Sequence, residues 1–340
     1  MNLKKHLPLY LAALSAAICA LVLSLGGGVG AQERIVMKVA TVAPEGTPWE
    51  QQLRRFKHYV EEGTGGRVQV KMFMGGSLGG EKALVRRTAQ GSIQVFAGST
   101  AALGSLVQEM NVVESPYLFA GGAAADTALD NEAVKAQVRT LVARRGFTFG
   151  FWAENGFRSW FTKDRPIRTP SDLSGLRMRS QEALVHLETY RALGASPVPI
   201  DVTNVLTSLQ TGVVDGFDNT PLFAFATSWY QAAHHLALSR HAYQPGIIVY
   251  SKRWFDGLPA DIQEVLRNVP QDMVQEGRTN VRRMDPILIR NLERYGLEVH
   301  EPSSAERASF AAATHTVADR VATKVGPGGR DLLRAIRAAH

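Results

Sequence analysis

The stretch that begins at residue 35 alternates strands and helices within a short span, and this pattern restricts the fold more than any other feature. The segments 35–41, 68–73 and 93–97 are short apolar or alternating runs typical of strands. Apolar residues at helical spacing follow the first run, where Thr47 can cap a helix, and a second helix is predicted over 81–89. Strand, helix, strand, helix, strand in this order predicts an α/β unit with a parallel sheet.

A second set of elements begins near Phe147. Strands are predicted at 147–152, 158–162, 176–179, 197–200, 214–217 and 247–250, and helices at 184–193 and 204–210. The run 247–250 is expected to return to the first sheet. From Pro259 the last part of the chain is predicted to be mostly helical, with breaks or kinks at Pro270 and Pro286.

These two sets predict an α/β protein of two lobes, each with its own sheet. The length of 340 residues favours two domains, and 45% hydrophobic residues suffice for a packed core. In such folds a ligand binds at the carboxyl ends of the strands. The sequence therefore predicts a binding cleft between the lobes.

Residues 1–31 are predicted to be a cleaved export signal. Lys4 and Lys5 precede a nearly continuous apolar run, and small residues end at Ala31. A retained membrane anchor is the alternative, because about 20 apolar residues can span a bilayer. The glycines before Ala31 favour cleavage, and we expect a periplasmic protein.

Cleavage would remove Cys19, the single cysteine, and would lower the formal net charge of the chain from +7 to +5. A protein without thiols suits an oxidising compartment. The remaining basic residues are scattered among acidic ones, so nucleic acid is not an expected partner.

Motifs of catalysis are missing from the sequence. It contains no phosphate loop, zinc-protease pair, dinucleotide fingerprint or nucleophile elbow. His234, His235 and His241 have neither a cysteine nor a close group of carboxylates to complete a metal site, so we expect ordinary histidines and no metal or cofactor. A periplasmic enzyme remains an alternative; its acid and base would have to come from Glu154, Asp218 and Tyr243.

Three polar positions stand at strand ends among apolar or aromatic residues. Arg158 lies between Phe157 and Trp160, Arg179 ends a predicted strand, and Asp218-Asn219 follows another. An arginine fork donates two parallel hydrogen bonds to a carboxylate, and an asparagine amide can add a third donor. The alternative is that both arginines pair with local acids such as Glu154 or Asp172, as most arginines do.

Six blocks in order along the chain resemble the solute-binding proteins of tripartite ATP-independent periplasmic (TRAP) transporters, of the DctP type. The blocks are Ser77–Glu81, Pro116–Phe119, Glu154–Arg158, Arg168–Arg179, Leu193–Pro199 and Leu209–Gly216. The resemblance implies two α/β lobes, joined by crossing segments and a long helix, that close on a ligand by hinge motion. It also implies that Arg179 and Arg158 bind a carboxylate, that Asn219 orients it, and that a membrane permease receives it.

The sequence departs from the family pattern near these residues. Ser180-Gln181 follows Arg179 where the family usually has Val-Pro, and Phe217-Asp218 replaces Gln-Glu before Asn219. The segment 217–230 is unusually aromatic, which suggests an apolar or aromatic tail on the ligand. At helical spacing, the same aromatics can instead pack the core of the lobe. A hydrophobic or lipid-like ligand is a further alternative.

We therefore predict a TRAP binding protein that captures a small organic acid. The lobes are predicted to comprise residues 34–155 with 242–282, and residues 156–241 with 283–340. The candidate ligand contacts are Arg158, Arg179, Asn219, Phe217, Asp218, Ser99 and Glu81. A sensor that hands its closed form to a membrane receptor would use the same architecture.

Overall fold

The computed structural model describes residues 34–340, so the predicted export signal and Cys19 lie outside the described residues. The strands are β1 (Ile35–Ala40), β2 (Val68–Phe73), β3 (Val95–Ser99), β4 (Phe147–Thr162), β5 (Arg177–Ser180), β6 (Ser196–Pro199), β7 (Gly216–Asn219), β8 (His235–Ser251) and β9 (Glu298–His300). The helices are α2 (Pro48–Gly63), α3 (Glu81–Ala89), α4 (Thr100–Leu103), α5 (Gly122–Asp130), α6 (Glu132–Ala143), α7 (Leu184–Ala192), α8 (Val205–Gln210), α9 (Pro221–Ala226), α10 (Lys252–Asp256), α11 (Ala260–Arg267), α12 (Gln271–Arg294), α13 (Ser304–Thr314), α14 (Val317–Lys324) and α15 (Pro327–Ala338).

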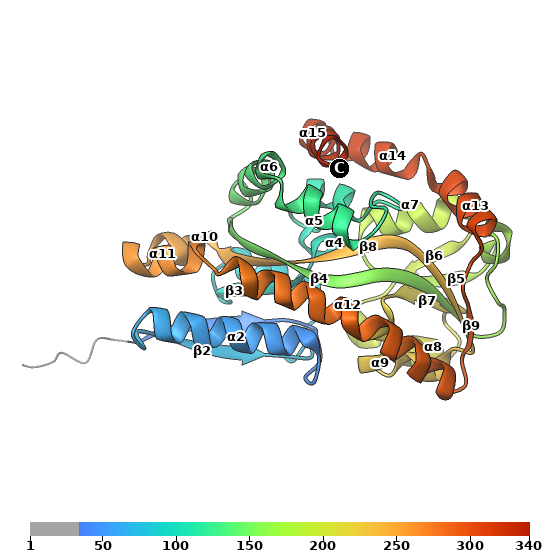
Figure 1. The fold of residues 1–340 in the computed structure, drawn as a ribbon, viewed down its shortest axis with the longest axis horizontal. Helices are drawn as coiled ribbons and strands as arrows, with labels where there is room; N and C mark the ends of the chain where they lie inside the picture. The colour runs from blue at the N-terminus through green and yellow to red at the C-terminus, as the bar shows by residue number, and fades with distance from the viewer. Residues whose placement is uncertain (1–33) are drawn as a thin grey trace, which may run out of the picture. The chain divides into compact units, whose positions relative to one another are not determined.

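The strands form a mixed sheet in the order β2-β1-β3-β8-β4-β7-β5-β6, and β9 joins the other end of β8. The β1–β3 pair at one end and the β5–β6 and β5–β7 pairs at the other are parallel. The long strands β4 and β8 run antiparallel to each other between them (Figure 1). The predicted α/β fold of two lobes is confirmed. The prediction that each lobe has its own sheet is wrong, because β4 and β8 join the parallel strands of both lobes into one sheet.

Strand β4 corrects one prediction of the sequence analysis. Two strands, 147–152 and 158–162, were expected, whereas residues 147–162 form one strand. Its pairing with β8 continues between the two predicted strands, because a shift in register between Glu154 and Gly156 accommodates one extra residue of β4. Gly156 has a φ of +105°, which a residue with a side chain rarely adopts.

The N-terminal unit agrees with the expected pattern. Helix α3 and strand β2 have the predicted bounds, and β3 lies two residues further along than expected. Helix α2 begins after Thr47, whose side chain accepts a hydrogen bond from the backbone of Glu50, and it buries Leu53, Phe56 and Val60 on one face.

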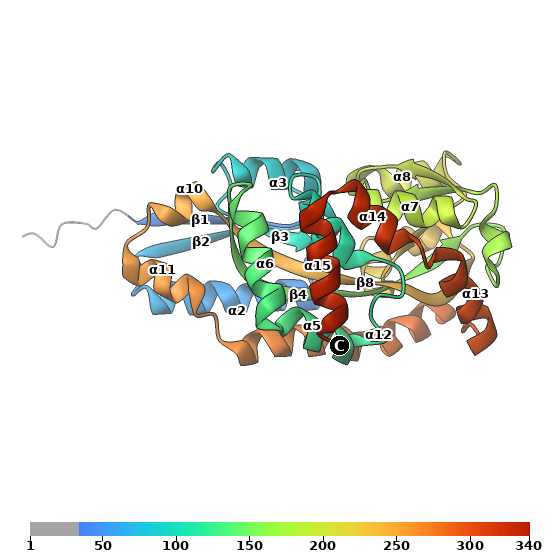
Figure 2. The ribbon, with the colours of Figure 1, turned by 90° about the horizontal axis from the view of Figure 1, so that it is seen from above.

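The half of the sheet that contains β2, β1 and β3 and the half that contains β7, β5 and β6 each have their own hydrophobic core. Phe96, Trp152 and Val249 belong to the largest cluster, which α6 and α15 cover from one face (Figure 2). In the other half, neighbouring residues of β4 enter separate cores on opposite faces: Phe161 packs with Phe217 and Trp229, and Trp160 packs with Met178 and Tyr190.

Helix α12 is the long helix that the family resemblance implied. It packs against α2 and β4 near one half and against α9 and β9 near the other (Figure 1). Pro270 precedes its first residue, and the helix runs on through Pro286. The predicted residue limits of the two lobes stay a prediction.

Candidate ligand-binding site

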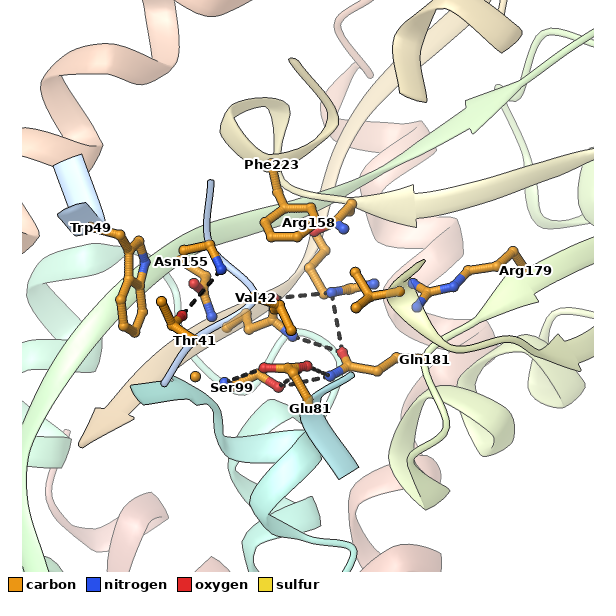
Figure 3. A pocket seen from close by; sticks show the side chains of 15 residues that line it. Thr41, Val42, Trp49, Glu81, Ser99, Asn155, Arg158, Arg179, Gln181 and Phe223 are labelled. Atoms are coloured by element: carbon orange, nitrogen blue, oxygen red, sulfur yellow. Dashed lines mark hydrogen bonds between the residues drawn. The ribbon is translucent and has the colours of Figure 1, made fainter. Parts of the chain in front are cut away.

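A narrow cavity of about 40 Å³ lies where the parallel strands of both halves end. Thr41 follows β1, Ser99 ends β3, Gln181 follows β5, and Asn219 ends β7. The other lining residues are Val42, Ala43, Trp49, Glu81, Gly98, Asn155, Arg158, Arg179, Val202, Phe223 and Gln244 (Figure 3). This is the place where ligands bind in α/β folds with parallel strands.

Trp49 forms one wall of the cavity. Its indole Nε1 donates a hydrogen bond to the backbone oxygen of Glu154 (2.9 Å). The ring lies directly on Gly246, where a Cβ atom would collide with it. A glycine in β8 therefore lets this wall approach the sheet.

Arg158 is buried, at 1% exposure, and most of its donors already have partners. Its Nε donates to Asp218 Oδ2 (2.5 Å) and its Nη2 to the backbone oxygen of Asp218 (2.6 Å). Its Nη1 donates to Gln244 Oε1 (3.0 Å) and Gln181 Oε1 (3.5 Å). Arg158 thus pairs with the acid beside Asn219 rather than with Glu154 or Asp172, and one of its five N–H groups is left over.

Asp218 lies behind Arg158 and does not line the cavity. Tyr190 Oη donates to its Oδ1 (2.7 Å). Burial by itself would raise the pKa of this carboxyl, but the charge and hydrogen bond of Arg158, together with His241 and His186, outweigh burial, so the pKa lies well below its usual range. Asp218 is therefore an ionised partner of Arg158.

Two glutamines connect Arg158 to the opposite side of the cavity. The amide of Gln181 donates to Ser99 Oγ (2.7 Å) and Glu81 Oε2 (3.0 Å). The amide of Gln244 donates to Gln181 Oε1 (3.0 Å) and to the buried carboxylate of Glu114 (2.8 Å). The hydrogen bonds therefore cross the cleft from β5 to β3 and α3.

Arg179 is equally buried but has a different environment. Its Nε and Nη2 both donate to the backbone oxygen of Ile200 (3.1 and 2.9 Å). Its guanidinium lies over the ring of Trp229, 5.2 Å from the ring centre, and points into the cavity (Figure 3). None of the ion pairs among residues 34–340 includes Arg179. Burial and the nearby charge of Arg158 lower its pKa to about 10, so it stays a cation at neutral pH.

Asn219 lines the cavity and holds a fixed orientation. Its Oδ1 accepts a hydrogen bond from the backbone of Thr220 (2.8 Å), which turns the amide nitrogen away from that backbone. The residue lies opposite Ser159 in the pairing of β4 with β7. Its NH₂ group remains as a donor for the cavity.

Glu81 and Ser99 form the acidic side of the cavity. Glu81 accepts hydrogen bonds from Ser99 N (2.8 Å) and Ser99 Oγ (3.1 Å), as well as from Gln181. Burial raises the pKa of the Glu81 carboxyl despite these donors.

The structure places Phe217 away from the cavity. Its side chain is fully buried and stacks on Phe161, with the ring centres 4.7 Å apart. Trp229 and Tyr230 belong to the same core. Among the aromatics of 217–230, Phe223 lines the cavity. Core packing therefore accounts for most of this aromatic segment.

The histidines and the candidate acid–base residues have structural contacts. His241 stacks on Trp160, with 3.6 Å between ring centres, and its Nε2 lies 3.4 Å from Asp218 Oδ2. Residues 34–340 contain no group of three side chains suited to hold a metal ion. Glu154 accepts from Tyr243 Oη (2.9 Å) and is paired with Arg282 (2.6 Å). The acid and base that the enzyme alternative needed are thus held in other contacts.

Sequence analysis missed Gln181, Gln244 and Glu114 as parts of this site. Gln181 was noted only as a departure from the family pattern. Gln244 and Glu114 belong to no motif, and only the fold brings them to Arg158. Gln244 lies opposite Gly156 in β4, so the register of a strand pair was the information required.

Comparison with known proteins identifies the family. The family model for bacterial extracellular solute-binding protein, family 7 (DctP), matches residues 39–324. The chain belongs to this family. The C4-dicarboxylate-binding periplasmic protein DctP of Rhodobacter capsulatus is 30% identical over 96% of this chain and 97% of the relative.

Solved structures agree with this assignment. A TRAP periplasmic solute-binding protein of Polaromonas sp. JS666, bound to D-erythronate, has a TM-score of 0.83 and 28% identity and covers 90% of this chain and 99% of its own. The sugar acid binding protein of Advenella mimigardefordensis, in complex with galactonate, has a TM-score of 0.84 and 26% identity over 91% of this chain and 99% of its own.

The DctP family consists of periplasmic solute-binding proteins that serve TRAP transporters. Its members bind small acids and work with membrane permease subunits, so this chain is a periplasmic binding protein and not an enzyme. Within residues 34–340, no helix combines the length and the apolar character needed to span a membrane.

Proposed function

We propose that this protein captures a small hydroxylated carboxylic acid and that Arg179 is the main anchor of its carboxylate. The observation that carries the proposal is the environment of Arg179. A buried guanidinium that points into a cavity and bonds only a backbone oxygen is an incomplete ion pair. A carboxylate from the ligand would complete it with strong, charge-assisted hydrogen bonds.

Arg158 would act beside Arg179 with its remaining N–H group. Because Asp218 already neutralises its charge, Arg158 would add direction to the carboxylate and little net attraction. The amide of Asn219 supplies the next donor on the same side of the cavity. The three residues together would fix the position and rotation of one carboxylate.

Hydroxyl groups on the ligand would fit the rest of the cavity. Glu81, Ser99 and Gln181 present a carboxylate, a hydroxyl and an amide, and Thr41 and Asn155 add further polar groups. The Polaromonas and Advenella proteins bind D-erythronate and galactonate, which are hydroxylated acids of this kind. This polar lining favours a hydroxy acid over an acid with an apolar tail.

Capture would proceed by hinge closure around the ligand. Residues from both halves line the cavity, so a bound acid would hold the halves together. The closed protein would then deliver the acid to the permease subunits of a TRAP transporter.

The test compares Arg179→Ala with Arg177→Ala, two residues earlier in the same strand. Arg177 is exposed and pairs with Asp215 (2.6 Å), so the control removes an arginine without changing the cavity. A thermal-shift screen of D-erythronate, D-galactonate, D-glucuronate and malate would first find an acid that stabilises the wild type.

Calorimetry with that acid should show that Arg179→Ala lowers the affinity by about 100-fold or more, because the charge-assisted hydrogen bonds are lost. Arg177→Ala should bind like the wild type. Equal affinity of Arg179→Ala and the wild type would overturn the role of Arg179. A screen in which lipids raise the melting temperature and every acid fails would overturn the proposed function.

A further inference from the structure

We infer that the site accepts an acid with one carboxylate and rejects the matching acid with two; this inference rests on the proposed function. It follows from a count of the charged groups around the cavity. Among the described residues that line the cavity, Arg179 is the cation that forms no ion pair with a carboxylate, so the site attracts one negative group.

The other cations near the cavity already have partners. Arg158 pairs with Asp218 at 2.5 Å, and both side chains are 1% exposed. Lys82 Nζ pairs with Glu182 Oε1 at 3.2 Å at the mouth of the cleft. Among the described lining residues, no further lysine, arginine or histidine is present.

Carboxylates surround the space next to Arg179. A second, smaller cavity of about 20 Å³ shares Arg179, Glu81 and Gln181 with the first. Its wall also contains Glu182 and Asp201. Lys82, which pairs with Glu182, lines this cavity as well. A ligand held by Arg179 that extends this way would bring a second carboxylate close to Glu81 and Asp201, two acids that form no ion pair among the described residues.

Asp201 is held firmly in this position. Its Oδ1 accepts hydrogen bonds from Thr203 N (3.0 Å) and Thr203 Oγ1 (2.7 Å). Its carboxylate lies against Gly80, where a Cβ atom would collide with it, at the start of α3. Asp201 also directly follows Ile200, whose carbonyl binds Arg179. Two neighbouring residues therefore act on the ligand in opposite ways: the carbonyl of Ile200 holds Arg179, and the carboxylate of Asp201 would repel a second carboxylate.

The opposite end of the cavity offers no compensation. Thr41, Trp49 and Asn155 are uncharged. The cavity of about 120 Å³ on the other side of Asn155 contains Arg282, but this arginine pairs with Asp126 (2.6 Å) and Glu154 (2.6 Å). A second carboxylate would therefore lose its water shell without gaining a cation, and like charges placed together reduce affinity strongly.

The experiment compares acids that differ only in one terminal group. Oxidation of the last carbon turns D-erythronate into meso-tartrate and D-galactonate into galactarate, with the other hydroxyls unchanged. Calorimetry at low ionic strength, where screening is weak, gives the ratio of affinities for each pair. The wild type should prefer the monocarboxylate by about tenfold or more.

A neutral variant of the acidic wall tests the cause. The variant Asp201→Asn removes a carboxylate of this wall, keeps an oxygen for the hydrogen bonds from Thr203 and leaves the Lys82–Glu182 pair intact, so the preference should fall by about tenfold. Asp215→Asn is the matched control, because it removes an acid that pairs with exposed Arg177 outside the cavity, and its preference should equal that of the wild type.

The outcomes separate this inference from the proposed function. Equal or tighter binding of the dicarboxylate by the wild type overturns the inference and leaves carboxylate capture intact. A preference that Asp201→Asn retains also overturns it, because the acidic wall would then not be its cause. If no carboxylic acid binds the wild type, the proposed function fails and the inference fails with it.

Discussion

Arg158 and Arg179 line the same cavity, but the charge of Arg158 is paired with a carboxylate inside the protein and that of Arg179 is not. Around Arg158, a carboxylate, a backbone oxygen and two glutamines satisfy the guanidinium inside the protein. Around Arg179, one backbone oxygen and an aromatic face are the direct contacts of the guanidinium, and it forms no ion pair within the described residues. The first region leaves one N–H group of its arginine for the cavity, whereas in the second region we propose that a ligand carboxylate completes an ion pair. The difference lies in the neighbours and not in burial, because both side chains are almost fully buried.

The largest expected effect on stability concerns the Arg158 region. Arg158→Ala leaves the Asp218 charge buried without its cation, so the free energy of unfolding should fall by about 3–5 kcal/mol. Urea unfolding followed by circular dichroism measures this loss. The exposed pair provides the control: Arg177→Ala should cost about 1 kcal/mol or less. Equal losses in the two variants would contradict the structural role of Arg158.

A smaller effect in the same region is a dependence of the free energy of unfolding on pH. Burial lowers the pKa of His241 to about 4, although Asp218 opposes this shift. In the unfolded chain His241 therefore binds a proton near pH 6.5, whereas in the folded protein it does so only near pH 4. Stability should be complete above pH 6.5 and should decrease, on the order of 1–3 kcal/mol, as the pH falls towards 4.

The variant His241→Phe isolates this contribution. A phenyl ring can keep the stacking on Trp160 but cannot titrate. Thermal unfolding between pH 7 and pH 4 should therefore show a flatter profile for the variant than for the wild type. Identical profiles would mean that His241 does not cause the pH dependence.

The smallest effect on stability is expected for the Arg179 region. Arg179→Met removes the bonds to Ile200 but also removes a buried charge without a carboxylate, and these changes oppose each other. The free energy of unfolding should change by less than about 1 kcal/mol. A loss as large as that of Arg158→Ala, measured in the same urea series, would erase the distinction between the two regions.

Local pattern was sufficient to predict much of the fold. The bounds of β2 and α3 follow from alternation and from helical spacing, which are properties of short segments. Strand β8 was predicted only at 247–250, although it spans residues 235–251. The strand includes Pro245, a residue that strand interiors disfavour; it lies opposite Glu154, directly beside the register shift in β4.

The candidate site was predictable in part: Glu81, Ser99, Arg158, Arg179 and Asn219 were named from the sequence and line the cavity, whereas Gln181, Gln244 and Glu114 were not. Arg158 and Arg179 stand out because arginine is rare between aromatic residues and at buried strand ends. Gln181 and Gln244 carry no comparable pattern, and their contacts arise from a turn after β5 and from the pairing of β8 with β4. The partner of Arg158 was also not evident, because Asp218 is 60 residues away in sequence and is brought close by the β4–β7 pairing.

Strands β4 and β8 and helix α12 all pass from one half of the protein to the other. A hinge closure of the cleft would therefore have to bend all three segments together. We expect this bending to be the main coordinate of the relative motion of the halves. A pair of spectroscopic labels, one on α11 and one on α8, would follow that coordinate as one changing distance.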